Sequence, residues 1–124
     1  MKKLLVITAA LEAGTGIGLL IAPAMVAQAL LGGTLDAPAA MTVARVAGAA
    51  LVALSVACWL ARDNGRALVV AMLFYNVAAV AVLAHAALSL ALSGIGLWPA
   101  IALHTALAGW CGAALAKVLV RQQP

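Results

Sequence analysis

Charge is what this sequence of 124 residues lacks most. Only 8% of its residues are charged, whereas 68% are hydrophobic. A soluble domain carries about 25% charged residues, so the composition excludes an ordinary water-soluble fold. The regular alternation of polar and apolar residues that a membrane β-barrel needs is also missing. A helical membrane protein is the class that remains.

Cysteine is limited to Cys58 and Cys111, and neither belongs to a CxxC pair. This spacing predicts neither a disulfide framework nor a zinc site, and we interpret both residues as buried free thiols. The sequence also contains no phosphate-binding loop, nucleophile elbow or metal-ligand spacing. We therefore expect no enzymatic activity, no catalytic residue, no metal and no cofactor.

Four long apolar stretches fill the chain. Each is long enough to cross a hydrocarbon core of ~30 Å as a helix, which takes about 20 residues. Backbone groups in lipid must be hydrogen-bonded within the protein, so the spans are helices. We predict an all-α fold, a bundle of four transmembrane helices that forms a single domain over residues 1–124. The helices are predicted at residues 4–31, 39–61, 67–92 and 97–120.

Basic residues are confined to the two ends and the second connection, apart from Arg45. They are Lys2, Lys3, Arg62, Arg66, Lys117 and Arg121, whereas the other two connections contain only Asp36. This positive-inside pattern predicts that both termini and residues 62–66 are cytoplasmic. We expect a multi-pass protein of the bacterial inner (plasma) membrane. The net charge of +4 then comes from basic residues that contact lipid headgroups, and we expect no nucleic-acid partner.

The first apolar stretch has two unusual features. Its basic start and the small residues around Gln28 resemble a cleavable signal, but Glu12 interrupts the apolar run, and we expect the segment to be retained. Pro23 lies within the same stretch. The helix therefore either kinks there or ends and resumes along the membrane interface.

Small residues recur at every fourth position of the first stretch, and another lies in the second. They are Ala10, Gly14, Gly18, Ala22 and Gly48. In lipid, such residues let helix backbones approach closely. We interpret them as helix-packing contacts within the monomer, and a homodimer seam is the alternative.

Four polar residues inside the predicted spans are the candidate site, and they are Glu12, Arg45, Asn76 and His104. On insertion scales, an acid or an arginine at a helix centre costs about 2.5–3.5 kcal/mol. At ~1.5 Å per residue, Glu12, Tyr75 and Asn76 lie in one layer, with Arg45 and His104 in a more external one. We predict an intramembrane polar cluster in which Glu12 pairs with Arg45, accepts a hydrogen bond from Asn76 and stays ionised. A structural ion pair, separate interhelical hydrogen bonds, and ion or substrate handling are the alternative roles.

The segments Leu11–Gly16, Leu19–Pro23 and Ala44–Gly48 resemble small bacterial four-helix inner-membrane proteins of the DoxX-like type. The resemblance extends over most of the chain. It implies the fold and the location, and it implies no reaction.

The segment around Glu12, with Ala13, Gly14 and Thr15, is also similar to small multidrug-resistance transporters, four-helix proteins with a functional glutamate in the first helix. The chain departs from that family in three features. Arg45 lies within the second span, the charge bias fixes one orientation, and the family's glycine pattern in the third helix is missing.

These observations favour a small integral inner-membrane protein that acts by helix packing, with itself as a homo-oligomer or as an accessory subunit of a larger membrane complex. One alternative is a small proton- or cation-coupled transporter or channel that uses Glu12. Another is a redox accessory that binds haem or quinone. The lipid bilayer is the partner common to all three hypotheses.

Overall fold

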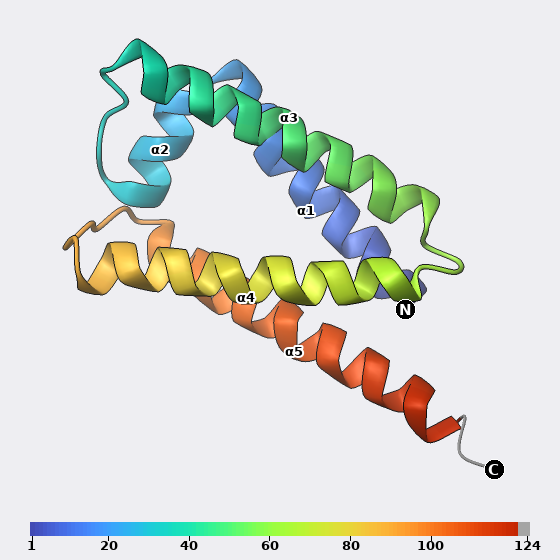
Figure 1. Cartoon of the computed structure of the whole chain (residues 1–124). Coiled ribbons are helices and arrows are strands. Elements are labelled where there is room, and N and C mark those ends of the chain that lie inside the picture. Colours follow the sequence, from blue (N-terminus) through green and yellow to red (C-terminus); the bar gives the residue numbers. More distant parts are fainter. Residues whose placement is uncertain (122–124) are drawn as a thin grey trace.

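The computed structural model describes residues 1–121, which contain helices and no strand (Figure 1). The helices are α1 (Lys2–Ile21), α2 (Pro23–Leu31), α3 (Pro38–Leu60), α4 (Arg66–Leu88) and α5 (Leu97–Arg121). Helices α1, α3 and α4, together with α5 as far as Val118, are long and apolar enough to cross a membrane. The prediction of an all-α chain is therefore confirmed for the described residues, as are four helices of the length and hydropathy that crossing a membrane requires.

The helix predicted at residues 4–31 is divided into two helices in the structure. Ala22, with φ −135° and ψ 58°, ends α1, and Pro23 begins α2. Proline is well suited to the first turn of a helix, because the N–H that it lacks has no partner there. Helix α2 has nine residues, about 14 Å at 1.5 Å per residue, and is too short to span. Of the two alternatives at Pro23, the helix ends and a new one begins.

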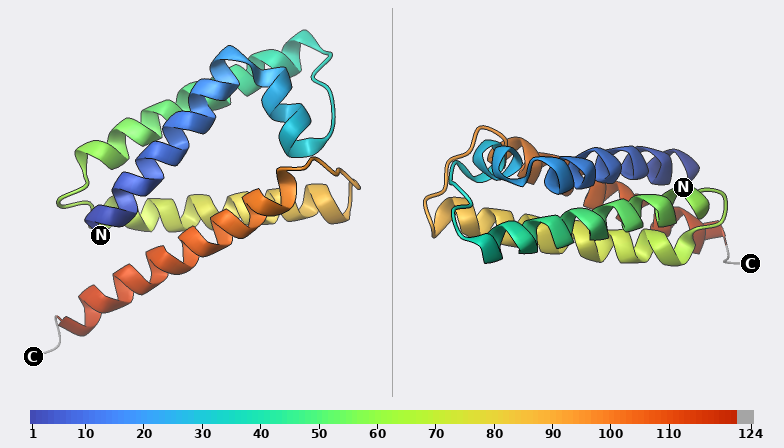
Figure 2. Two further views of the ribbon diagram at one scale, coloured as in Figure 1. Left: turned by 180° about the vertical axis from the view of Figure 1, so that it is seen from behind. Right: turned by 90° about the horizontal axis from the view of Figure 1, so that it is seen from above.

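The four long helices form two hairpins. Helix α1 packs along α3, and α4 packs along α5. The hairpins meet near the N-terminus and diverge toward the other end, where α2 turns back across the opening (Figures 1 and 2). Helix α2 contacts α1, α3 and α5. The bundle is therefore a wedge that is narrow at one end and bridged by α2 at the other.

Helices α1 and α3 approach most closely at Gly16 and Gly48. A Cβ atom on Gly48 would lie 2.7 Å from the carbonyl oxygen of Gly16, and a Cβ atom on Gly16 would lie 2.7 Å from that of Gly48. Both distances are far inside van der Waals contact, so this crossing requires glycine on both helices. Close approach of small residues is a usual basis of helix association in lipid.

Most of the small residues predicted to pack on α1 lie outside this contact. Ala10 is exposed, and a Cβ atom on Gly14 would meet nothing within 4 Å. Gly18 faces the side chain of Val26 on α2, and Ala22 ends α1. Of the predicted set, Gly48 alone forms the α1–α3 crossing, because α1 turns its Glu12 and Gly16 face toward the rest of the protein.

The narrow end of the wedge is closed by an apolar core to which all four long helices contribute. Its members are Leu4, Leu5, Ala9, Cys58, Val69, Met72, Leu107 and Cys111. All of them are almost completely buried. This core separates the middle of the bundle from the surface near the N-terminus.

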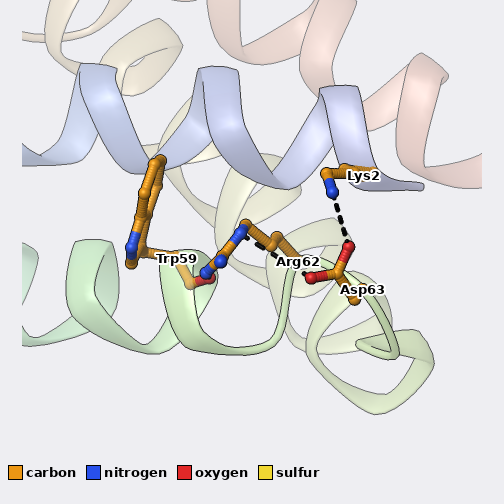
Figure 3. Close-up of polar contacts among 4 residues, drawn as sticks. All are labelled: Lys2, Trp59, Arg62 and Asp63. Carbon is orange, nitrogen blue, oxygen red and sulfur yellow. Dashed lines mark hydrogen bonds and ion pairs between the residues drawn. The ribbon is translucent and has the colours of Figure 1, made fainter.

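A cluster of charged side chains covers that end (Figure 3). The Nζ atom of Lys2 lies 2.8 Å from Oδ1 of Asp63, and Nε of Arg62 lies 3.7 Å from Oδ2 of the same residue. Arg62 also donates to the carbonyl of Trp59 and lies over its ring. The hydrogen bond from Lys2 holds the pKa of the Asp63 carboxyl below its ordinary value. The cluster ties the start of α1 to the α3–α4 connection.

Candidate functional site

Glu12 is the single acidic residue within the helices that span the membrane. It lies ten residues after Lys2, which places it about 15 Å along α1 at 1.5 Å per residue. Its side chain is buried, with 4% of its surface exposed. The hydroxyl of Tyr75 on α4 donates to its carboxylate, with 3.3 Å between Oη and Oε2. Glu12 is thus a mid-membrane acid whose partner is a neutral side chain.

The ion pair predicted between Glu12 and Arg45 is not formed. Arg45 lies on the exposed side of α3, and no carboxylate in the described part of the chain is within ion-pair distance of it. The crossing of Gly16 with Gly48 sets the heights of the two residues. Glu12 lies four residues from this crossing toward the N-terminal end of α1, and Arg45 lies three residues from it toward the N-terminal end of the antiparallel α3, an axial gap of about 10 Å. The two charges are consequently separated in depth and in direction.

Asn76 and His104 are joined to each other. Asn76 is fully buried, its Nδ2 donates to the carbonyl of Met72 at 2.7 Å, and its Oδ1 lies 2.8 Å from Nδ1 of His104. A carbonyl only accepts, so the amide nitrogen must face Met72 and the amide oxygen must face His104. His104 therefore donates from Nδ1, and in the neutral imidazole Nε2 is left as an acceptor. Asn76 does not donate to Glu12 as predicted, because its amide is used on α4 and α5.

Tyr75 connects the two polar pairs. Its hydroxyl bonds to Glu12, and its ring packs edge-on against His104, with 5.7 Å between ring centroids and an interplanar angle of 78°. The structure therefore brings together Glu12, Tyr75, Asn76 and His104 from α1, α4 and α5. Of the predicted cluster, Arg45 is the member left outside. Sequence analysis placed Tyr75 in the layer of Glu12 but gave it no role.

A further polar group lies one turn from Glu12. Thr8, on the same face of α1, is 1% exposed, and its hydroxyl has no hydrogen-bond partner among residues 1–121. An unsatisfied buried hydroxyl is rare and costs about 1–3 kcal/mol. Thr8 and Glu12 together leave hydrogen-bonding capacity unused in the middle of the bundle.

No family model, curated protein or solved structure matches this chain. The chemistry of the cluster therefore has to be argued from its own geometry.

A cavity of about 430 Å³ adjoins the cluster on the side of α2. His104 and Thr15 are its polar lining residues. The other lining residues are Gly14, Val26, Ala29, Leu30, Leu83, Gly96, Ala100 and Leu103. On its other side the cluster borders the apolar core, through Met72 on α4. The cluster is thus approached from the wide end of the wedge and closed off at the narrow end.

The cluster lacks the ligands of a metal centre. Within the described residues, no three side chains of His, Cys, Asp or Glu lie close enough to hold a metal ion. What it does contain is one carboxylate, one phenol hydroxyl bonded to it and one imidazole beside the phenol ring, and these are groups that accept and donate protons. Proton or cation handling is the chemistry that this set of side chains can perform.

Proposed function

We propose that this protein is a small multi-pass carrier of the bacterial inner membrane that handles a proton or a small cation at Glu12. The supporting observation is the environment of Glu12, a buried acid in the middle of a span whose partner is Tyr75 rather than a base. Ionisable residues inside membranes are rare, face the bundle interior and mark ion pathways and proton relays. The expectation that Glu12 stays ionised rested on an ion pair with Arg45 and a hydrogen bond from Asn76, and neither contact is formed.

The two ends of the site differ, because one adjoins a cavity and the other an apolar core, and this difference favours a carrier over an open channel. His104 lines the cavity beneath α2, whereas the core around Leu5, Val69 and Met72 is apolar and buried. A site that is approached from one side at a time is what alternating access between two halves requires. The division of the bundle into two hairpins supplies such halves.

Arg45 favours a second function, that of a non-enzymatic accessory subunit. Its side chain lies on the exposed surface of α3, about 10 Å from the start of that helix at 1.5 Å per residue. An arginine at this depth is stabilised by an acidic partner or by reaching the headgroups. A second copy of the chain or another membrane protein would provide the partner. The DoxX-like resemblance is part of this proposal and bears on fold and location alone.

The orientation that goes with both functions places the two termini and the α3–α4 connection in the cytoplasm. In a background with Cys58→Ala and Cys111→Ala, we expect Thr34→Cys and Ile95→Cys to react with a membrane-impermeant thiol reagent from the periplasm, because both positions are exposed in the outer connections. Asn64→Cys should react only after the membrane is opened. Labelling of Asn64→Cys in intact cells would reverse the orientation.

Proton handling is tested by flux in proteoliposomes. Under an imposed pH gradient, we expect Glu12→Gln to lower the protein-dependent proton flux by about 100-fold, the low end of what a positioned proton-transfer group contributes. Asp36→Asn is the matched control, because it also exchanges a carboxylate for an amide but lies in an exposed connection. The control should keep the wild-type flux.

Chemical modification provides an independent readout of the same residue. A hydrophobic carbodiimide should modify Glu12, and a transported cation should protect it. Equal flux in the wild type and in Glu12→Gln, with no modification of Glu12, would reject the carrier and leave the accessory role.

A further inference from the structure

The cavity beneath α2 has apolar walls and contains no charged side chain. Its volume of about 430 Å³ lies within the range of ~300–1,000 Å³ that is usual for small-molecule sites. Val26 and Leu30 on α2, Leu83 on α4 and Leu103 on α5 form much of the wall. Leu103 is 42% exposed, so the cavity opens on the lipid side of α5. A molecule dissolved in the bilayer can therefore enter it.

Two side chains on opposite hairpins give the cavity a polar end. His104 presents an imidazole whose Nδ1 donates to Asn76, so its Nε2 is free to accept. Thr15 presents a hydroxyl that bonds to no other group in the described residues. Two other helical threonines, Thr42 and Thr105, instead donate to the carbonyl four residues earlier, at 2.9 Å and 2.8 Å. The polar end thus offers one acceptor and one group able to donate or accept.

These groups select the head of a ligand. A hydroxyl group donates one hydrogen bond and accepts others, so it matches both the acceptor on His104 and the hydroxyl of Thr15. A charged head is disfavoured, because an unpaired charge in an apolar cavity is costly and Glu12 is not among the lining residues. A pure hydrocarbon would leave both polar groups without partners.

Gly14 leaves space on one side of the cavity, and a hydrogen bond from Gly96 holds α2 on the other side. A Cβ atom on Gly14 would meet nothing within 4 Å, so the space beside Gly14 is unfilled. On the other side, the backbone N–H of Gly96 donates to the carbonyl of Ala29 at 2.8 Å, which holds α2 over the cavity. The cavity is therefore bounded by α2 on one side and open beside Leu103 on the other.

We propose that this cavity binds an uncharged lipid-soluble alcohol, with its hydroxyl group between His104 and Thr15 and its apolar body against Val26, Leu83 and Leu103. The site is next to Glu12 and does not include it. Alcohol binding therefore goes beyond proton handling, and either property can fail while the other holds.

The experiment uses the full chain in lipid nanodiscs and three photoreactive probes that carry the same diazirine-bearing dodecyl chain. One ends in a hydroxyl, one in a methyl and one in an ammonium group. We expect saturable labelling by the alcohol, mapped to the cavity residues by mass spectrometry. The methyl and ammonium probes should give only non-saturable labelling of lipid-exposed positions.

Two variants and one control locate the site. Gly14→Val should fill the cavity and abolish saturable labelling. Gly109→Val is the matched control, because Gly109 is exposed like Gly14 and a Cβ atom there also meets nothing within 4 Å, but Gly109 does not line the cavity. Thr15→Val, which keeps the shape of the side chain, should weaken alcohol binding about fivefold, the value of one hydrogen bond.

Unchanged saturable labelling in both Gly14→Val and Thr15→Val would overturn the proposal. So would equal saturable labelling by the methyl or the ammonium probe. Because Thr15→Val adds no volume, it decides the question even if Gly14→Val fails to fold.

Discussion

Gly48→Val is expected to lower the free energy of unfolding of the bundle by about 3 kcal/mol, the upper part of the range for an overpacked site. The new Cβ atom would lie 2.7 Å from the carbonyl oxygen of Gly16, 2.9 Å from Cβ of Leu19 and 3.0 Å from the backbone nitrogen of Leu20. Two of these atoms are helix backbone, so relief requires α1 to move away from α3. Unfolding in mixed detergent micelles measures the change.

Gly109→Val is the control for this change as well. It introduces the same side chain into a helix, at a position where a Cβ atom has no neighbour within 4 Å. We expect its unfolding free energy to stay within about 0.5 kcal/mol of the wild type. Because valine has a higher helix propensity than glycine, similar losses in both variants would show that the Gly16–Gly48 crossing is not the cause.

Tyr75→Phe is expected to lower the unfolding free energy by about 1.5 kcal/mol, near the top of the range measured for interhelical hydrogen bonds in membranes. The effect is at the upper end because the change removes the donor and leaves the buried carboxylate of Glu12 without its partner. In a Glu12→Leu background, the same change should have almost no effect. A double-mutant cycle of these two substitutions measures the coupling.

A second double-mutant cycle, with Glu12→Leu and Arg45→Met, tests whether Glu12 and Arg45 interact. The structure has no ion pair between them, whereas the sequence predicted one. Because Arg45 is exposed and makes no ion pair with Glu12, the two effects should add to within about 0.5 kcal/mol. Coupling of Glu12 to Arg45 as strong as its coupling to Tyr75 would restore the ion pair and remove the basis for an unpaired acid.

The spans were predictable because length and hydropathy alone determine them. The predicted ranges 39–61 and 67–92 correspond to Pro38–Leu60 and Arg66–Leu88. The third helix ends four residues earlier than predicted, before Ala91, whose φ of 52° is incompatible with continuation. The break at Pro23 was recognised as a site of change, but local sequence does not distinguish a kink from two helices.

The depth of the site residues along their helices was predictable from the sequence, but the side of each helix that faces the bundle interior was not. A rise of ~1.5 Å per residue placed Glu12 in the layer of Tyr75 and Asn76, and the structure joins Glu12 to one of these two. Which face of α1 turns inward depends on its partner helix. Small residues occur on several faces of α1, at Ala10, Gly14 and Gly16, so the pattern of small residues favoured a face that the crossing at Gly48 does not use.

The position of α2 has a consequence for the order in which the protein assembles. Helix α2 is made early, directly after α1, but the groups that hold it, Gly96 and the tightly packed Gly94, lie more than sixty residues later in the chain. During synthesis α2 can pack on α1 and α3, but its contacts with Gly94 and Gly96 form only after the α4–α5 connection has been made. The apolar core also depends on α5, because Leu107 and Cys111 belong to it. The cavity and the core are therefore both completed only once α5 has been made, and a chain that stops before α5 would lose ligand binding and core packing together.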